Sequence, residues 1–484
     1  MKQRDFIFNV AILIFLNLLV KPFWILGIDV AVQNRVGVAA YGLYFAIFNF
    51  TYLFNVVLDM GITNFNNRNI ARHSQLLQKH LSGIIVLKLL LGGVYMLVTF
   101  AVAAAIGYDS LHFHLLFWMS INQFLNAFIL YLRSNVSALL LFKTDSVLSV
   151  LDRLLMILIC GILLWTNVLK TDFTIQHFIY AQTAAYTLAA LAALAVVLHK
   201  SGLRRLQWNP AFFIMILKKS LPFALLYLLM AFYNRIDSVM IERLLPGDIS
   251  TFEAGVYASV FRLLDALAMI AYLFSVILLP LFSKMLKERE NLAGIVNSAF
   301  SLLFFFSVTA VVLLLVYRFP VLELLYDAHI DNSAAVFIFL IPCIIPISMT
   351  YVFGTLLTAN GSMKLLNLTA ALGIVVNLAV NFILIPRMQA RGAAIASLST
   401  QSVMALIQTV IAFRQLQIPM RNFPIFRAVI FTVLLVPGVL LVHRYFTGSA
   451  LAGLIIGGVY AFVVAFATRL IPLRFWRDFS SPRG

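Results

Sequence analysis

Charged and amide side chains inside long apolar segments are the residues of this chain best suited to chemistry. Segment 233–237, Tyr-Asn-Arg-Ile-Asp, lies late in an apolar run from 221 to 241, and the next run contains Arg262 and Asp265. Charges are costly in hydrocarbon, so those kept in a membrane span are candidates for a functional site. A simpler interpretation is that Arg262 and Asp265, three residues apart, neutralise each other on one helix face. Arg235 can also extend toward the nearer membrane surface.

Three of the candidates are cations, and together they suit an anionic ligand. Lys21 lies in the first apolar run, Arg235 in the seventh and Arg262 in the eighth. The guanidinium group binds phosphate through a planar fork of N–H donors. We therefore predict that Lys21, Arg235 and Arg262 bind the phosphates of a substrate head group.

Three further residues accompany these cations. Asn234 precedes Asp237 by three residues, so the two share a helix face, and the amide offers a neutral hydrogen bond to a sugar or an ion. Asp237 and Asp265 would hold the arginines in position or take part in ion coupling. The candidate site is therefore Lys21, Asn234, Arg235 and Arg262, with Asp237 and Asp265 as charge partners.

The other charges inside apolar runs have simpler interpretations. Asp59 is predicted to cap a helix or anchor a loop, and Lys88 to extend to the cytoplasmic surface. Asp152 and Arg153 are adjacent and are interpreted as a boundary pair near the cytoplasm. The sequence suggests no role for Arg133.

The composition excludes a soluble protein. Of 484 residues 63% are hydrophobic and only 11% charged, with a mean hydropathy of +1.00, whereas soluble domains carry roughly 25% charged residues. The apolar runs are continuous and long enough for membrane-spanning helices, and they lack the alternation of transmembrane strands. The net charge of +17 does not indicate nucleic-acid binding, because the basic residues are spread over short loops.

The sequence predicts an all-α polytopic membrane protein of about fourteen transmembrane helices. No linker is long enough for a soluble domain, and the polar stretch 199–219 is interpreted as a short amphipathic helix in the membrane interface. With the N-terminus inside, cytoplasmic loops and termini carry 22 of the 35 Lys and Arg residues and external loops carry 7, which predicts that both termini are cytoplasmic. The predicted spans are roughly 6–28, 41–63, 81–106, 113–142, 146–168, 175–198, 220–241, 255–281, 295–317, 334–359, 364–386, 392–414, 424–443 and 449–471.

A weak internal repeat divides these spans. A shift of 213 residues, read from the numbering, aligns Gly42 with Gly255 and Lys21 with Asn234. Six spans per repeat return the chain to the same side, so the predicted lobes, 1–210 and 211–420, are parallel and surround a central cavity. Residues 421–484 add two helices and a cytoplasmic tail.

Enzyme and metal-site signatures are absent from the sequence. There is no H-E-x-x-H, no phosphate-binding G-x-x-x-x-G-K-[ST] and no Asp-x-Asp pair. His112 and His114 are predicted to lie in a solvated external loop, and Cys160 and Cys343 fall in apolar runs, which argues against a disulfide or a zinc site. We therefore expect neither catalysis nor a cofactor nor a metal. The basic N-terminus is predicted to lead into an uncleaved first span.

Several motifs together resemble bacterial polysaccharide flippases of the O-antigen (Wzx) type, within the multidrug/oligosaccharidyl-lipid/polysaccharide exporter superfamily. The similarity runs from about the first span to the twelfth. One departure is Met388-Gln389, where a glycine is often found. The motifs are Gly42-x-Tyr44, Leu58-Asp59-Met60-Gly61, Arg235-Ile236-Asp237, Gly255-Val256-Tyr257, Leu264-Asp265-Ala266-Leu267, and Asn377…Asn381-x-x-Leu384-Ile385-Pro386 followed by Gly392-Ala393-Ala394-Ile395-Ala396.

This resemblance implies a flippase that moves a polyprenyl-diphosphate-linked oligosaccharide across the bacterial inner membrane by alternating access, for O-antigen, capsule or exopolysaccharide synthesis. It implies that cavity cations bind the diphosphate. Lys21 and Arg262 stand where the family places such charges, and Arg235 adjoins another. The expected partners are the lipid-linked substrate, the bilayer and a coupling proton or sodium ion, without nucleic acid, and the expected functional state is a monomer. The alternatives are a cation-coupled multidrug antiporter of the same fold and a flippase of the peptidoglycan precursor lipid II.

Overall fold

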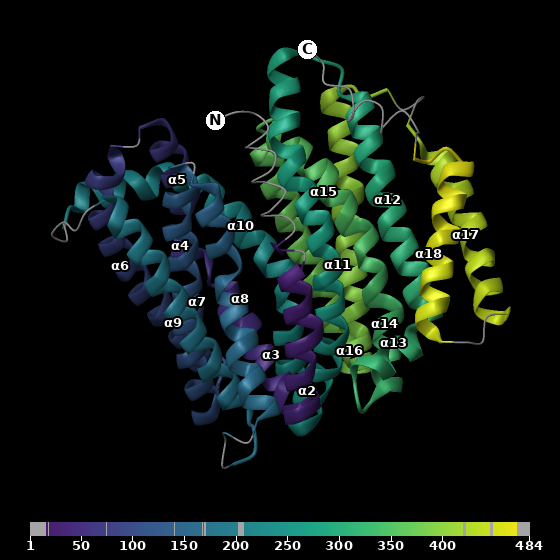
Figure 1. Cartoon of the computed structure of the whole chain (residues 1–484), viewed down its shortest axis with the longest axis horizontal. Coiled ribbons are helices and arrows are strands. Elements are labelled where there is room, and N and C mark those ends of the chain that lie inside the picture. Colours follow the sequence, from purple (N-terminus) through teal and green to yellow (C-terminus); the bar gives the residue numbers. More distant parts are fainter. Residues whose placement is uncertain are drawn as a thin grey trace. The chain divides into compact units, whose positions relative to one another are not determined.

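The computed structural model describes residues 16–17, 19–73, 75–139, 141–166, 168, 171–201, 208–419, 423–445 and 449–471, and throughout these ranges the regular structure is helical (Figure 1). Eleven helices in the described part are long and apolar enough to cross a membrane. The predicted all-α polytopic membrane fold is confirmed. The count of fourteen spans stays a prediction.

The chain divides into two compact units, Met1–Gly255 and Val256–Gly484. The predicted lobe boundaries at 210 and 420, the parallel arrangement and the central cavity stay predictions. The described elements of the first unit are η1 (Trp24–Asp29, a π-helix), α2 (Val30–Val36), α3 (Val38–Leu53), α4 (Val56–Asp59), α5 (Ile62–Arg72), α6 (Leu76–Ala105), α7 (Ser110–Ala138), α8 (Phe142–Trp165), α9 (Ile175–Ser201), α10 (Pro210–Leu244) and the start of α11 (Gly247–Glu288).

The predicted second span, 41–63, is broken into short helices. Phe54 and Asn55 separate α3 from α4, and the turn between α4 and α5 places Met60 at φ 45° and Gly61 at φ 78°. Glycine adopts positive φ without a steric penalty, which explains the Gly61 of the motif. The break leaves carbonyl groups at the end of α4 that need partners inside the bundle.

Helix α10 corrects the interpretation of residues 199–219. It begins at Pro210 and continues without interruption to Leu244, so residues 210–219 form its first turns rather than a separate interfacial helix. The side chain of Asn209 accepts a hydrogen bond from the backbone N–H of Phe212 at 3.1 Å. Asparagine at the N-cap and proline at the first position both favour a helix start.

Gly42 of α3 and Gly255 of α11, which the repeat aligns, pack against each other inside the first unit. A Cβ on Gly42 would lie 1.9 Å from the carbonyl oxygen of Thr251 and 2.5 Å from the nitrogen of Gly255. A Cβ on Gly255 would lie 2.0 Å from the carbonyl oxygen of Val38. Both positions therefore require glycine for backbones that nearly touch.

The second unit is also helical. A sharp kink at Gln389 (φ 55°, ψ −135°) lies in the region where spans 364–386 and 392–414 are predicted to meet. Gln389 belongs to the Met388-Gln389 departure, and the chain thus places a residue with a side chain in a conformation that favours glycine. The elements of this unit are the rest of α11, α12 (Ala293–Val316), α13 (Arg318–Leu325), α14 (Ile330–Leu340), η2 (Ile341–Cys343), α15 (Ile344–Ala359), α16 (Met363–Leu416), α17 (Ile425–Tyr445) and α18 (Ala450–Ala467).

Candidate functional site

Lys21 lies in the helical stretch 19–23 that leads directly into η1, and it is on the face of this stretch that contacts α8. Residues 17, 21 and 24 are spaced by about one helical turn and share one face. Asn17 donates a hydrogen bond to the hydroxyl of Ser149 at 3.0 Å, and the guanidinium carbon of Arg153 lies 5.8 Å from the centre of the Trp24 ring. Since the residues on both sides of Lys21 contact α8, the half-buried Lys21 side chain faces α8 as well.

Two arginines accompany Lys21 in the first unit, and the sequence did not assign either to the site. The charges of Arg153, Asp152 and Arg133 all act on Lys21. Arg133 of α7 forms an ion pair with Asp145 of α8, with Nε 2.9 Å from Oδ1. Lys21 therefore belongs to a charged cluster built from three helices. A signal in the sequence was the occurrence of Arg133 and Arg153 inside apolar runs.

Segment 233–237 lies on α10, also within the first unit. The guanidinium carbon of Arg235 lies 5.3 Å from the centre of the Tyr52 ring, a cation–π contact. The hydroxyl of Tyr52 in turn lies 2.8 Å from the hydroxyl of Tyr227. Asn234 and Arg235 are partly exposed, whereas Asp237 is buried. Tyr52 and Tyr227, which the sequence did not single out, thus help to orient Arg235.

Arg262 and Asp265 lie on the part of α11 that belongs to the second unit. Both side chains are partly exposed, and they are three residues apart on one helix face. Lys21 therefore lies against α8, and Arg235 lies against α3. Arg262 belongs to the second unit. The joining of all three cations in one substrate site stays a prediction.

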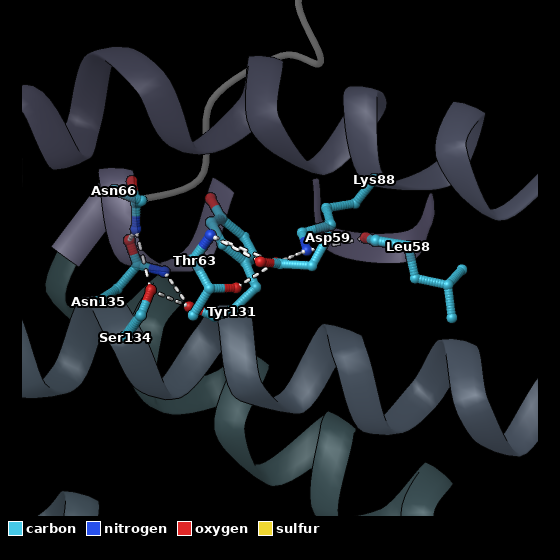
Figure 2. A network of polar contacts seen from close by, with 8 residues as sticks. All are labelled: Leu58, Asp59, Thr63, Asn66, Lys88, Tyr131, Ser134 and Asn135. Atoms are coloured by element: carbon cyan, nitrogen blue, oxygen red, sulfur yellow. Dashed lines mark hydrogen bonds and ion pairs between the residues drawn. The ribbon is translucent and has the colours of Figure 1, made fainter. Parts of the chain in front are cut away.

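The pair of buried Lys88 and partly exposed Asp59 corrects one expectation and supports another (Figure 2). The Lys88 side chain is only 1% exposed; its ammonium group contacts the Asp59 carboxylate and donates to the carbonyl of Leu58 at 3.0 Å. The prediction that Lys88 extends to the surface is wrong, because the helix break supplies internal acceptors. Asp59 caps α5 by accepting from the backbone N–H of Thr63 at 3.2 Å, as predicted.

An amide network continues from this pair toward the other end of α5 (Figure 2). Asn66 donates to the hydroxyl of Ser134 at 3.1 Å and to the side-chain oxygen of Asn135 at 2.9 Å. Asn135 and Ser134 both donate to the carbonyl of Tyr131. These contacts fasten α5 to α7, so the broken second span is held by polar contacts on both sides of its turn.

His112 also differs from its expected environment. Its Nδ1 lies 2.7 Å from Asp109, and its Nε2 lies 3.3 Å from Glu242 of α10. Its ring stacks on Tyr108, over which the guanidinium of Arg243 lies at 4.0 Å. The predicted solvated loop is wrong for His112, because these contacts tie the start of α7 to the end of α10. In the described ranges, no group of three His, Cys, Asp or Glu residues could hold a metal ion.

Comparison with known proteins extends these findings. A lipid II flippase, MurJ, in an inward closed conformation, aligns with a TM-score of 0.73 and 14% identity, covering 98% of this chain and 100% of that one. An inward-facing multidrug resistance transporter of the MATE family aligns with a TM-score of 0.63 and 13% identity, covering 85% of this chain and 98% of that one. A MOP superfamily transporter from Pyrococcus furiosus aligns with a TM-score of 0.58 and 15% identity, covering 84% of this chain and 94% of that one. At such identities the likeness establishes the fold alone.

The sequence comparison identifies the family. No curated protein sequence matches the chain significantly. The family model described as polysaccharide biosynthesis protein matches residues 6–286, which is more than half of the chain. The chain therefore belongs to the polysaccharide biosynthesis protein family, and it is a multi-pass membrane protein with the fold of the multidrug/oligosaccharidyl-lipid/polysaccharide exporter superfamily.

Proposed function

We propose that this protein is a flippase for polyprenyl-diphosphate-linked oligosaccharide, serving O-antigen, capsule or exopolysaccharide synthesis. The observation that carries the proposal is the occurrence of the cations Lys21, Arg235 and Arg262 within apolar helices of a polysaccharide-biosynthesis transporter. Cations are retained in a membrane only when a partner or a ligand offsets their desolvation. A diphosphate is such a ligand, because arginine and lysine bind its oxygens through charge-assisted hydrogen bonds.

The proposed mechanism follows from the two chemical parts of the substrate. The sugar and the diphosphate would pass through a polar cavity between the predicted lobes, while the polyprenyl tail stays in the lipid. Alternating access would expose the cavity first to the cytoplasm and then to the outside, with a proton or a sodium ion as the coupling ion. The protein would act as a monomer in the bacterial inner membrane with both termini in the cytoplasm.

The charge balance favours an anionic substrate over a cationic drug. Residues within three positions of a span end set aside, the predicted spans contain six basic and four acidic residues. A transporter of cationic drugs needs carboxylates for its ligand, whereas Arg235 presents a guanidinium group supported by Tyr52. The similarity of the fold to that of a lipid II flippase agrees with this choice.

The test removes the three cations one at a time. Cells that lack their own copy receive the wild type or the variants Lys21→Ala, Arg235→Ala or Arg262→Ala, and surface polysaccharide is measured at equal protein abundance. Each loss of a charged hydrogen bond should lower the amount about tenfold or more. Lys143→Ala removes an exposed charge at the start of α8 and should leave the amount unchanged. Normal polysaccharide in all three variants would contradict the cationic site.

The same cells distinguish the alternative substrates. Deletion should stop surface polysaccharide and leave drug sensitivity and cell-wall growth unchanged. Unchanged polysaccharide with increased sensitivity to cationic drugs would instead indicate multidrug transport. Accumulation of lipid II with arrested growth would indicate the peptidoglycan precursor as substrate.

A further inference from the structure

We propose that Arg153 is a second phosphate-binding residue beside Lys21, so that the two side chains receive the two phosphates of one diphosphate head group. This inference rests on the proposed function, because it assigns a further residue to the same substrate. The sequence alone paired Arg153 with Asp152, and the two side chains do approach to 3.7 Å. Four features of the first unit argue that Arg153 has a ligand-binding role as well.

The first feature is the direction in which Lys21 faces. Asn17 and Trp24 flank Lys21 on its helix face, and they contact Ser149 and Arg153, respectively. Ser149 and Arg153 are four residues apart on α8 and therefore lie on one face of that helix. Lys21 and Arg153 thus lie on two helix faces that pack against each other, and their charges interact.

The second feature is the aromatic frame of the Arg153 guanidinium. Its carbon lies 5.8 Å from the centre of the Trp24 ring and 5.7 Å from that of the Tyr186 ring. Trp24 itself stacks on Phe178 at 5.9 Å with an interplanar angle of 8°. Both rings that contact the guanidinium are buried. The two rings orient the guanidinium group but carry no negative charge that would neutralise it. A pre-organised anion site holds its cation in this way, whereas an ion pair neutralises it.

The third feature is the use of the N–H donors. Nη1 of Arg153 donates to the hydroxyl of Tyr186 at 3.1 Å and contacts the sulfur of Met156 at 3.7 Å. Nη2 donates no hydrogen bond to any residue that the structure describes. The side chain is 25% exposed. One edge of the guanidinium fork is therefore available to a phosphate.

The fourth feature is the balance of charge. Arg133 has its own carboxylate, Asp145, at 2.9 Å. Within the described part of the chain, Asp152 is the carboxylate whose charge acts on both Lys21 and Arg153, and it lies 3.7 Å from Nε of Arg153. Two cations thus share one carboxylate. A dianionic ligand would supply the missing negative charge.

The test measures binding of farnesyl diphosphate and farnesyl monophosphate to the purified full-length protein in detergent. Arg153→Ala should weaken binding of the diphosphate about tenfold and that of the monophosphate less than about twofold, because Lys21 still receives the first phosphate. Arg153→Lys should recover part of the loss, since it restores the charge but not the fork. Lys143→Ala, on the same helix, should bind both probes like the wild type.

The outcomes separate this inference from the proposed function. Wild-type binding that Arg153→Ala leaves unchanged would overturn the role of Arg153 and leave the proposed function standing. Equal weakening of both probes would also overturn it, because it would indicate a structural role for Arg153. If the wild type bound neither probe, both the inference and the proposed function would be overturned.

Discussion

Two charged groups in the first unit each combine at least one basic residue with one aspartate, but they are built in opposite ways. Asp59 and Lys88 form a closed pair, in which the ammonium group is buried and contacts both a carboxylate and the end of a helix. Lys21 and Arg153 form an open cluster, in which two partly exposed cations share Asp152. The closed pair satisfies its charges within the protein. The open cluster leaves positive charge and donors for another molecule.

This difference shows why a charge inside an apolar helix does not by itself identify a binding site. Lys88 stabilises the break between α4 and α5, since it binds the carbonyl of Leu58 while Asp59 caps the next helix. Arg153 lies on the regular helix α8, where there is no such break to stabilise. Two properties therefore separate a structural cation from a candidate ligand-binding one: the number of carboxylates per cation, and the exposed fraction of the cation.

The largest expected effect comes from opening the closed pair. Lys88→Met leaves the Asp59 carboxylate and the Leu58 carbonyl without their cation. Breaking a buried pair costs about 3–5 kcal/mol, and the partial exposure of Asp59 places the expected loss at the lower end of this range. We expect a large drop in the thermal unfolding temperature in detergent, whereas Arg153→Lys should unfold close to the wild type. The double variant Asp59→Asn/Lys88→Met should regain part of the loss. Wild-type stability of Lys88→Met would refute the structural role.

An intermediate loss of stability is expected at Arg133. This residue acts on Lys21 of the open cluster, but it has a carboxylate partner of its own, as Lys88 does. Arg133→Gln removes a partly buried ion pair with Asp145, and we expect a loss of about 2 kcal/mol, between the values for surface and buried pairs. Arg133→Gln/Asp145→Asn keeps the net charge and should bind farnesyl diphosphate like the wild type. A tenfold loss of affinity in this double variant would extend the binding site to Arg133.

The sequence predicts the fold of this protein well because long apolar runs allow few structures in a membrane. The motif residues Gly42 and Gly255 were also identifiable, and their close packing explains why both are glycine. The role of Lys88 was not predictable, since it depends on the break in the second span. A hydropathy pattern treats residues 41–63 as one helix and gives no sign of the carbonyl acceptor at Leu58.

The candidate site was predicted less completely than the fold. Lys21 and Arg235 were recognisable as cations in apolar runs, but the aromatic partners of Arg235 and Arg153 come from other helices. Asp152 and Arg153 were recognisable as a pair because they are adjacent in sequence, and Oδ2 of Asp152 does lie 3.7 Å from Nε of Arg153. The contacts of Trp24 and Tyr186 decide the environment of Arg153, and only helix packing reveals them.

The smallest expected effect concerns Asp109, an exposed carboxylate that differs from both groups. The hydrogen bond from the backbone N–H of His112, with a second from its ring, holds the pKa of Asp109 below its ordinary value. The stability that Asp109 contributes is therefore fully present at pH values above its ordinary pKa of about 4. It is lost as the pH falls through the lowered pKa of the folded protein. Asp109→Ala should cost about 1 kcal/mol at pH 7 through loss of the helix cap. Asp109→Asn keeps a capping oxygen and should unfold near the wild-type temperature at pH 7, without this acid-dependent loss. Thermal unfolding between pH 7 and pH 3 measures both effects, and an equally steep acid response in Asp109→Asn would assign the loss to other carboxylates.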